Sequence, residues 1–562
     1  MEVTTPAEWV GETMFPHQPP SSARGNASRS WPPGRQSRPP AAGGSPVHRR
    51  LFFGSEAAQC RDAFGRYGRG VLGRAVTFAL VGLEPRRVEV EAHLRTGQQP
   101  TFSIVGLADR ACQEAKHRVR SGVHSARLPW PDEVITVNLA PAALRKEGTG
   151  FDLAIGLTLL AAAGELPVDR LEEHACIGEL GLDGAIRPVA GVIAAAEGAA
   201  RAGLSRLLCP AAAAAEAALA GIEAIGVRHL AEAVGYLRGE DAIEPAAPGE
   251  SLRAPVVLPD LADVRGQERG RRALELAAAG THNLLLAGPP GTGKTMLARR
   301  LPSILPELSS DHALEVTRIH SVAGTLPPGS GLLATPPFRA PHHGASAASV
   351  VGGGAVPRPG EVSLAHRGVL LLDELPEFPR PVLEALRQPL EDGVVSVARV
   401  GGRALFPARF RLVATMNLCP CGGRGDPRIE CACTPARIAG YRDKVSRALL
   451  DRFDLVVAMP RPRAEELAAE PSEPSSAVRA RVVEAAARLE RETPRRVLAA
   501  SELLDRAVDR LPLSGRGRAR VARVARTVAA LGGSSDVLPE HVAEALRYLF
   551  EPIEVGRRAV RA

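Results

Sequence analysis

The hydrophobic and polar positions divide the chain into stretches with different periodicities. Between Val76 and Ala231, short strand-type runs (VEVEAHL, TFSIVGL and EVITVNLA) alternate with alanine-rich stretches of helical spacing. Farther on, the runs NLLLAG, GVLLLDEL and RFRLVATMN are apolar at almost every position, which is typical of strands buried on both faces of a parallel sheet. From about Glu465, alanine, leucine and arginine recur at helical spacing. The pattern predicts two α/β regions followed by a helical region.

The breaks between these stretches predict the domain boundaries. Residues 1–70 are rich in Pro, Gly, Ser and Arg and can bury too little apolar surface to fold, so we interpret them as a disordered basic tail. A start of translation near Val71 remains the alternative. The expected domains are an α/β domain at 71–238, a Pro- and acid-rich linker at 239–260, a second α/β domain at 261–460 and a helical lid domain at 461–562.

Composition adds few constraints. The 562 residues exceed what a single core usually serves, and the formal net charge is +8. Residues 1–70 hold nine Arg and five acidic residues, a local charge of 9 − 5 = +4, so the basic excess is only weak evidence for a nucleic-acid partner. The chain contains neither a long uninterrupted apolar stretch nor a secretory leader pattern, so we expect a cytoplasmic protein without a membrane partner.

The most informative motif is NLLLAGPPGTGKT, a buried strand followed by a glycine-rich loop and the helical run MLARRL. Glycines let backbone N–H groups curl around a phosphate, Lys294 can reach the β- and γ-oxygens, and Thr295 can offer its hydroxyl to Mg²⁺. The sequence therefore predicts an ATP site. Its cofactor-binding residues are Gly288, Pro289, Pro290, Gly291, Thr292, Gly293, Lys294, Thr295 and, farther along the chain, Asp373.

Asp373 and Glu374 follow the second buried run, GVLLLDEL. We expect Asp373 to hold Mg²⁺ and Glu374 to polarise the attacking water. Asn417 ends the third run and could orient that water, or it could merely close a strand in a turn. Arg452, in LLDRFDLVV, could reach the γ-phosphate of a neighbouring subunit in a ring ATPase. Its alternative is a surface pair with Asp454.

Arginines recur at helical spacing in SGRGRARVARVAR. Arg516, Arg520 and Arg523 share one face, and we expect one of them to contact the γ-phosphate of its own subunit. A solvated or nucleic-acid-facing stripe is the alternative for the others.

Four of the eight cysteines gather in one short loop. Cys419, Cys421, Cys431 and Cys433 form two C-x-C pairs that could surround one structural Zn²⁺. Reduced thiols and a redox disulfide are the alternatives.

Several long motifs resemble the ComM/YifB group of magnesium-chelatase-like AAA+ proteins. They are FSIVGLADRACQEAKHRVRS, VNLAPAALRKEGTGFDLAI, FRAPHHGASAASVVGGG, PRPGEVSLAHRGVLLLDELPEF, LRQPLEDG and NLCPCG. The resemblance implies a Lon-protease-like (S5-type) α/β domain at the N-terminus, a AAA+ P-loop core, and assembly into a homohexamer. It also implies ATP-driven branch migration of DNA during natural transformation, and it carries over Arg516 as the second sensor.

The Lon-like domain lacks the peptidase residues. Alignment with the nucleophile segment puts Gly150 in place of the serine, and alignment with the lysine segment puts Ile193 in place of the base. Thr149 is the nearby hydroxyl, without an evident base. We therefore expect a non-proteolytic scaffold or a collar that contacts substrate.

Three functions remain open on the sequence. The first is a DNA motor, in which loops carrying His342, His343, Arg399 and Arg403 could line a channel, with ordinary surface loops as the alternative for these residues. The second is a magnesium-chelatase motor subunit, and the third is a protein-remodelling ATPase.

Overall fold

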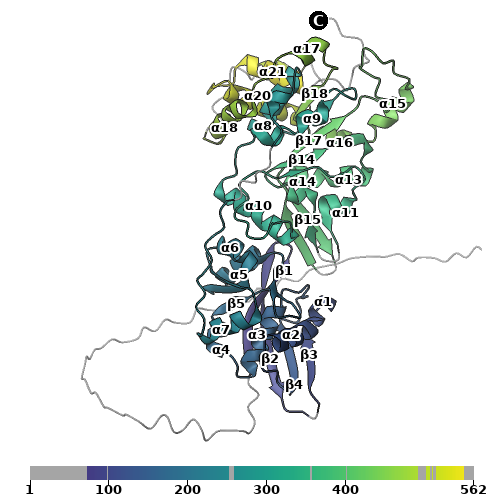
Figure 1. Cartoon of the computed structure of the whole chain (residues 1–562). Coiled ribbons are helices and arrows are strands. Elements are labelled where there is room, and N and C mark those ends of the chain that lie inside the picture. The colour runs from purple at the N-terminus through teal and green to yellow at the C-terminus, as the bar shows by residue number, and fades with distance from the viewer. Residues whose placement is uncertain are drawn as a thin grey trace, which may run out of the picture. The chain divides into compact units, whose positions relative to one another are not determined.

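The structure is a computed structural model that describes residues 72–549, except residues 98, 252–257, 355–356, 400–401, 492–501, 507–508 and 510–513. The expected tail at 1–70 lies outside the described residues. Figure 1 shows the parts of the chain, and each part is described here by itself.

The first part is built on a seven-stranded mixed sheet. The strand order is β3-β4-β2-β1-β5-β8-β9. The pairs β1–β2 and β2–β4 are antiparallel, and the remaining neighbours are parallel. The strands are β1 (Leu72–Val81), β2 (Glu84–Arg95), β3 (Thr101–Val105), β4 (Val134–Ala140), β5 (His174–Cys176), β8 (Arg206–Pro210) and β9 (Glu223–Val227). The expected strands VEVEAHL, TFSIVGL and EVITVNLA correspond to β2, β3 and β4.

Helices cover both faces of this sheet, as β1 demonstrates. Its residues Ala75 and Ala79 belong to one core with helix α3, while Val76 and Phe78 belong to another with α5 and α6. Alternate residues of a strand point to opposite faces, so each face has its own apolar layer. The helices are α1 (Arg110–Gln113), α2 (Ala115–Ser125), α3 (Asp152–Ala162), α4 (Val168–Glu172), α5 (Val192–Arg201), α6 (Ala211–Ala218) and α7 (Leu230–Arg238), and a small ribbon pairs β6 (Glu179–Leu180) with β7 (Ile186–Arg187).

The second part contains a five-stranded parallel sheet with the order β11-β14-β17-β10-β18. Its strands are β11 (Phe338–Arg339), β14 (Val369–Leu372), β17 (Arg411–Met416), β10 (Leu284–Ala287) and β18 (Leu455–Ala458). In β10, Leu284 and Leu286 enter one core, whereas Leu285 and Ala287 enter another on the opposite face. Burial on both faces explains why these strands read as continuous apolar runs.

The strand order determines which loops meet. Strand β17 lies between β10 and β14, and all three run in the same direction. The segments that follow their carboxyl ends therefore lie at one edge of the sheet, and the segments that precede them lie at the other.

Short helices and a hairpin surround this sheet. They are η1 (Leu261–Asp263), α8 (Glu268–Gly280), α9 (Lys294–Ala298), η2 (Leu301–Ile304), α10 (Ser310–Ala323), α11 (Ala347–Val351), α12 (Glu361–Leu364), η3 (Leu375–Glu377), α13 (Arg380–Ala385), α14 (Arg387–Asp392), α15 (Pro435–Arg442) and α16 (Arg447–Leu450). Strands β15 (Val394–Arg399) and β16 (Gly402–Pro407) form an antiparallel hairpin, and β12 (Gly352–Gly353) pairs with β13 (Arg358–Pro359).

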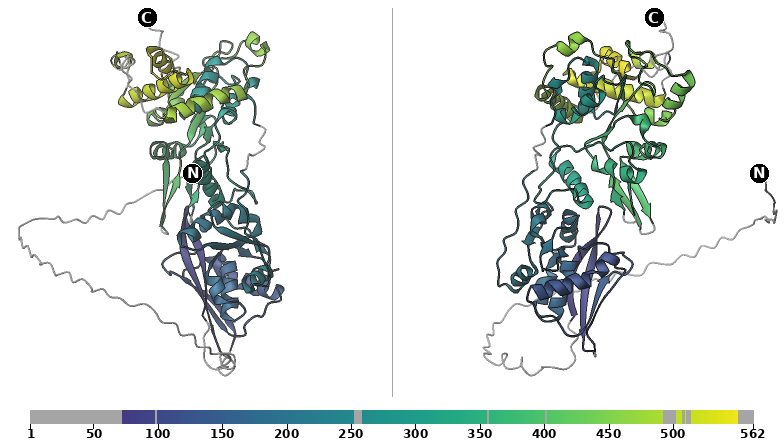
Figure 2. Two further views of the ribbon diagram at one scale, coloured as in Figure 1. Left: turned by 90° about the vertical axis from the view of Figure 1, so that its left-hand side faces the viewer. Right: turned by 45° about the vertical axis from the view of Figure 1, so that its right-hand side comes forward.

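The C-terminal described segment is helical. It contains α17 (Ala464–Ala468), α18 (Ser475–Arg491), α20 (Gly515–Leu531) and α21 (Pro539–Leu549). Helices α18, α20 and α21, drawn from yellow-green to yellow in Figure 2, share one hydrophobic core with α8 and β10. Val482, Val524 and Val542 are each at most 1 % exposed in that core. The helical segment is thus fixed to the parallel sheet by apolar packing.

Candidate nucleotide-binding site

The loop between β10 and α9 leaves an open space beside its backbone. Gly291 and Gly293 have φ values of 75° and 88°, in the left-handed region that favours glycine. A Cβ added to either residue would meet no atom within 4 Å. The loop therefore forms a cradle with room for a phosphate group.

Lys294 lies at this cradle with its ammonium group held by oxygens. Its Nζ donates to the carbonyls of Gly288 (2.9 Å) and Pro289 (2.7 Å) and to Oδ1 of Asn417 (3.1 Å). Burial lowers the pKa of Lys294 to about 8, and the nearby carboxylates of Asp373 and Glu374 act in the opposite direction. A cation with so few fixed negative partners is suited to receive phosphate oxygens.

The acidic pair from β14 lies next to the same loop. Oγ1 of Thr295 donates to Oδ1 of Asp373 at 2.8 Å, so the hydroxyl and carboxylate predicted to hold Mg²⁺ are already neighbours. Glu374 has a φ of 57°, a left-handed conformation that is uncommon for residues other than glycine. Oxygen ligands of this kind suit Mg²⁺.

Thr415 is a residue of this site that the sequence analysis missed. It is buried in β17, and its Oγ1 donates to Oδ1 of Asp373 at 2.6 Å while accepting from the backbone N–H of Glu374 at 3.0 Å. One hydroxyl thus positions both acidic residues. Its signal in the sequence was a single polar position within an apolar strand.

Gln267 is a second missed residue. It precedes α8 with a φ of 55°, and its Nε2 donates to the carbonyl of Thr292 (3.1 Å) and to that of Pro460 (2.7 Å). The side chain therefore connects the glycine-rich loop to the segment that follows β18.

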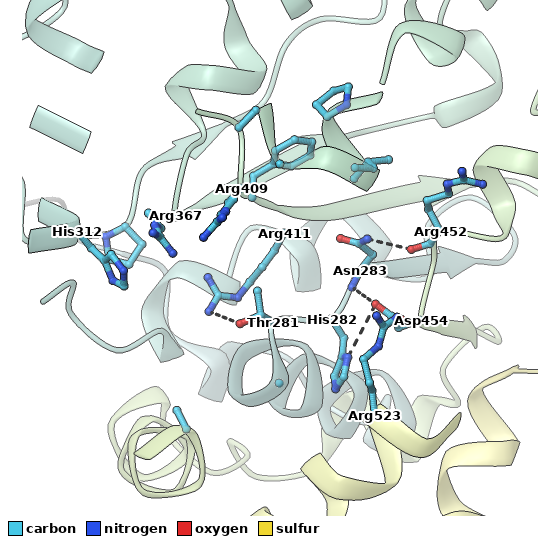
Figure 3. Close-up of a pocket in the computed structure, with 18 of the residues that line it drawn as sticks. Thr281, His282, Asn283, His312, Arg367, Arg409, Arg411, Arg452, Asp454 and Arg523 are labelled. Carbon is cyan, nitrogen blue, oxygen red and sulfur yellow. Dashed lines mark hydrogen bonds and ion pairs between the residues drawn. The ribbon is translucent and has the colours of Figure 1, made fainter. Parts of the chain in front are cut away.

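Five of the predicted site residues come together at the carboxyl edge of the sheet: Lys294, Thr295, Asp373, Glu374 and Asn417. Arg452 and Arg516 do not join them. Both line a cavity of about 1520 Å³ at the other edge, which Figure 3 shows in part. That cavity is bordered by Asn283 before β10, Arg367 before β14 and Arg411 at the start of β17.

Arg452 is held in place within this cavity wall. Its side chain is 10 % exposed, forms an ion pair with Glu391 and donates to the carbonyl of Ala448 at 2.6 Å. Nδ2 of Asn283 donates to the carbonyl of Arg452 at 2.9 Å. The alternative of a surface pair with Asp454 is wrong, because Asp454 is buried and accepts from Arg523 at 2.6 Å.

The arginines of α20 lie at the same edge as Arg452. Arg516 is 71 % exposed and pairs with Glu391 at 3.5 Å, while Arg520 donates to the carbonyl of Phe453 at 2.7 Å. The expected contact of one of these arginines with the γ-phosphate of its own subunit does not fit this placement. The cradle lies at the opposite ends of the strands, so Arg516 faces away from it together with Arg452.

The loops expected to line a channel are described in part. His342 is exposed, and the ring of His343 packs edge-on against Phe378 at 6.4 Å. Arg403 lies exposed on β16 and donates to Oγ of Ser396 at 2.8 Å. The side chain of Arg399 lies outside the described residues.

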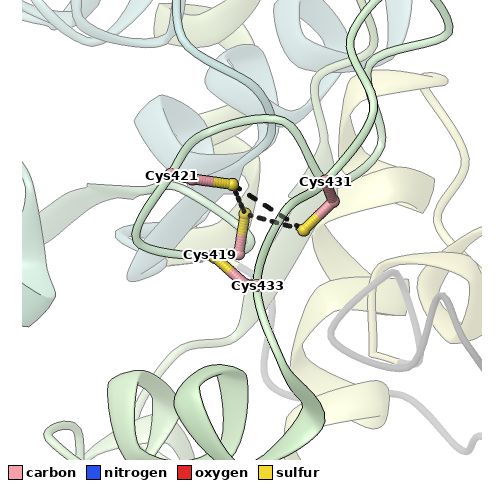
Figure 4. Close-up of side chains that lie close together, drawn as sticks. All are labelled: Cys419, Cys421, Cys431 and Cys433. Atoms are coloured by element: carbon pink, nitrogen blue, oxygen red, sulfur yellow. Dashed lines mark hydrogen bonds between the residues drawn. The ribbon is translucent and has the colours of Figure 1, made fainter.

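The four clustered cysteines converge on one point, as Figure 4 shows. Their Sγ atoms all lie within 4.8 Å of one another, and three of the separations are 3.4, 3.6 and 3.7 Å. A disulfide bond is about 2.05 Å long, so these thiols are not joined. Four thiolates around one Zn²⁺ at about 2.3 Å lie about 3.8 Å apart, close to the observed distances.

The expected peptidase positions of the first part can also be placed. Gly150 and Ile193 are present as glycine and isoleucine, so neither offers a nucleophile or a base. Thr149 has a carboxylate neighbour, since its Oγ1 donates to Oε2 of Glu179 at 2.5 Å. An ordinary carboxylate is a weak base for a hydroxyl, so the pair does not replace the missing dyad.

The sheet order and the cradle at the end of β10 define the class of this protein: it has the AAA+ P-loop α/β fold. Three family models match the chain. They are "Magnesium chelatase, subunit ChlI" at residues 260–467, "Subunit ChlI of Mg-chelatase" at 90–213 and "Magnesium chelatase, subunit ChlI C-terminal" at 472–549.

Three relatives match most of the chain. An uncharacterized protein of Mycobacterium tuberculosis is 45% identical over 85% of this chain and 98% of its own length. YifB of Salmonella typhimurium is 41% identical and competence protein ComM of Haemophilus influenzae is 38% identical, each over 84% of this chain and 96% of its own length. The chain therefore belongs to the magnesium-chelatase-like family, as a protein of the ComM/YifB type.

Family membership indicates an ATPase that uses ATP and Mg²⁺, and the residues at the cradle suit both. Within the part of the chain that the structure describes, no helix is long and apolar enough to cross a membrane.

Proposed function

We propose that this protein is a cytoplasmic, homohexameric AAA+ ATPase that uses ATP hydrolysis to move DNA. In this proposal it drives branch migration while incoming DNA recombines. The relative from Haemophilus influenzae carries the name competence protein, which supports a role in natural transformation.

The observation that supports assembly into a ring is the distance between Lys294 and Arg452 within one chain. Lys294 follows the carboxyl end of β10, whereas Arg452 precedes β18, the parallel neighbour of β10. From Asn283 to Gly288 the strand spans about 16 Å, at about 3.3 Å per residue. Arg452 therefore lies too far from the cradle of its own chain, and a neighbouring subunit would have to present its cradle to Arg452.

The residues at the cradle can divide the chemistry of hydrolysis among them. Bound Mg²⁺ would neutralise charge on the β- and γ-phosphates, and Thr295 and Asp373 would hold it. Lys294 would bind phosphate oxygens. Glu374 would polarise the attacking water, and Asn417 would orient it.

The negative charge on the γ-phosphate needs positive charge beyond that of Lys294, and a neighbouring subunit would supply it. Arg452, and Arg516 beside it, would approach the γ-phosphate across the subunit interface and stabilise the charge of the transition state. Glu391, which pairs with both arginines, would be exchanged for phosphate oxygens at that point.

The remaining parts have supporting roles in this proposal. The first α/β domain is a Lon-like, non-proteolytic collar, the helices after residue 461 form the lid domain, and the four cysteines bind a structural zinc ion. DNA would follow a channel lined by the hairpin of β15 and β16 and by the loop of His342. Arg403 is exposed on that hairpin and could contact the phosphate backbone.

The family models leave a second candidate. The models describe the ChlI subunit of magnesium chelatase, so a motor subunit that drives metal insertion is one competing function. A protein-remodelling ATPase is the other. Neither competitor should respond to DNA.

The experiment is the ATPase rate with and without single-stranded, duplex and branched DNA. We expect stimulation by DNA, reduced in Arg403→Ala and retained in Arg86→Ala, which removes an exposed arginine from β2 of the first part. A rate that none of the DNA forms changes, in an active hexamer, would contradict the DNA motor and favour the competitors.

A further inference from the structure

The loop that carries the four cysteines has little structure of its own. From Leu418 to Thr434 it contains no helix or strand, and all its residues are described. A loop of this length is held by side-chain contacts or by a bound ion. The four Sγ atoms are the groups that its two halves bring together.

Backbone N–H groups point at two of these sulfurs. The N–H of Arg424 donates to Sγ of Cys419 at 3.3 Å, and that of Gly423 donates to Sγ of Cys421 at 3.5 Å. Such bonds stabilise thiolates that ligate a metal. Four thiolates this close would repel one another without a cation, and four sulfur ligands leave no open position for substrate. The chemistry is that of a structural zinc site.

The same loop lies directly against the nucleotide cradle. At Gly422, where φ is 78°, an added Cβ would lie 2.8 Å from Cγ of Pro290 and 2.9 Å from its Cδ. At Gly425 an added Cβ would lie 3.9 Å from Cγ of Pro289. The backbone of the cysteine loop therefore supports both prolines of the glycine-rich loop.

The loop is also continuous with the residue expected to orient water. Asn417 is two residues before Cys419, and the intervening Leu418 is 6 % exposed. Oδ1 of Asn417 accepts from Lys294, and the N–H of Gly288 donates to the carbonyl of Met416 at 3.1 Å. A shift of Cys419 would thus be transmitted to Asn417 and Lys294.

The far side of the loop has a separate anchor. Asp426 is buried, accepts from Nε of Arg461 at 2.9 Å and receives the N–H of Arg428 at 2.9 Å. This anchor fixes the middle of the loop, whereas Cys431 meets Cys419 through an Sγ–Sγ contact at 3.6 Å. A bound metal ion would turn that contact into a firm link.

We propose that a zinc ion held by these four cysteines braces the nucleotide cradle, so that metal occupancy controls ATP binding and hydrolysis. This inference rests on the proposed ATPase function. Loss of zinc lets the loop move away from Pro290 and displaces Asn417. A displacement of about 1 Å at reacting groups costs on the order of 100-fold in rate.

The first test removes the metal from the full-length protein with a chelator and then restores it with ZnCl₂. Bound zinc, the dissociation constant of a fluorescent ATP analogue and the single-turnover hydrolysis rate are measured at each stage. We expect about one zinc per chain, an affinity loss of about tenfold and a rate loss on the order of 100-fold on removal, both reversed by zinc. Circular dichroism checks that the metal-free protein is folded.

The second test separates the effect of metal binding from the effect of the contact between the cysteine loop and Pro290. Gly422→Ala keeps all four thiols but places a methyl group against Pro290, so zinc should remain while ATP affinity falls. Gly203→Ala is the matched control, because Gly203 has the same left-handed backbone, with a φ of 79°, but a Cβ there meets nothing within 4 Å, and the variant should retain both zinc and affinity.

The outcomes are distinguishable. A protein that binds and hydrolyses ATP but contains no zinc would overturn the metal site. Zinc that can be removed without changing ATP affinity or rate would overturn the coupling and leave the ATPase intact. A zinc-containing, folded protein that does not bind ATP would refute the proposed function and the coupling together.

Discussion

Substitution of Thr415 tests how Asp373 and Glu374 are positioned, because its hydroxyl forms a hydrogen bond with each of them. In Thr415→Val the shape of the side chain is kept, but Asp373 loses a 2.6 Å hydrogen bond and the N–H of Glu374 loses its 3.0 Å acceptor. A hydrogen bond to a charged group contributes about 1.5–3 kcal/mol, and a buried N–H left without a partner costs about 1–3 kcal/mol.

We therefore expect a loss of roughly 3 kcal/mol in the free energy of unfolding, because Thr295 still donates to Asp373 and limits the damage. The larger effect should be on chemistry. Glu374 holds an uncommon left-handed conformation, and without its N–H bond the carboxylate should leave the position needed to polarise water. We expect the hydrolysis rate to fall on the order of 100-fold while ATP affinity changes less than about tenfold.

The assay is single-turnover hydrolysis together with analogue binding and denaturant unfolding. Thr415→Ser keeps the hydroxyl and should hydrolyse ATP at nearly the wild-type rate. Thr158→Val, which removes a buried hydroxyl bonded to the carbonyl of Ala154 in the first part, controls for loss of stability alone. A Thr415→Val protein that is folded and hydrolyses ATP normally would refute the positioning role.

Two further predictions concern the cradle. Glu374→Gln should bind MgATP but lose hydrolysis by orders of magnitude, whereas Lys294→Ala should lose affinity itself, and equal affinity losses measured by analogue titration would refute the two assignments. Because burial lowers the pKa of Lys294 to about 8, the free protein loses this positive charge as the pH rises through that value, and ATP affinity should then fall by up to about tenfold per pH unit. Lys294→Arg keeps its charge and should remove that dependence, so an equally steep affinity profile in the variant would show that another group is responsible.

The buried strands could be predicted from the sequence because their environment leaves a strong pattern. In β10, β14 and β17 both faces are covered by apolar cores, so nearly every position is apolar and the first polar residues mark the carboxyl edge. Asp373 and Asn417 were found in this way, Lys294 was found from the glycine-rich motif that follows β10, and the structure brings the three together.

The positions of the arginines and of two further polar residues could not be predicted, because they depend on contacts between distant segments that sequence periodicity does not encode. Glu391 and Arg452, which form an ion pair, lie 61 residues apart in the sequence. The position of Arg516 at the same end of the strands depends on how α20 packs on the sheet. Thr415 and Gln267 were missed for the same reason, since each is a single polar residue whose partners lie elsewhere in the chain.

The most direct test of the ring is complementation between two inactive proteins. Arg452→Ala and Lys294→Ala should each be inactive alone, but mixed interfaces combine the intact Lys294 of one subunit with the intact Arg452 of its neighbour. With random assembly at equal amounts, about one quarter of interfaces are rebuilt, so hydrolysis should recover to about one quarter of the wild-type rate. Mixing Lys294→Ala with Glu374→Gln is the matched control, because both residues belong to the same cradle and no interface becomes complete. Recovery in the first mixture alone is the predicted result, and no recovery in mixtures that do co-assemble would contradict the ring.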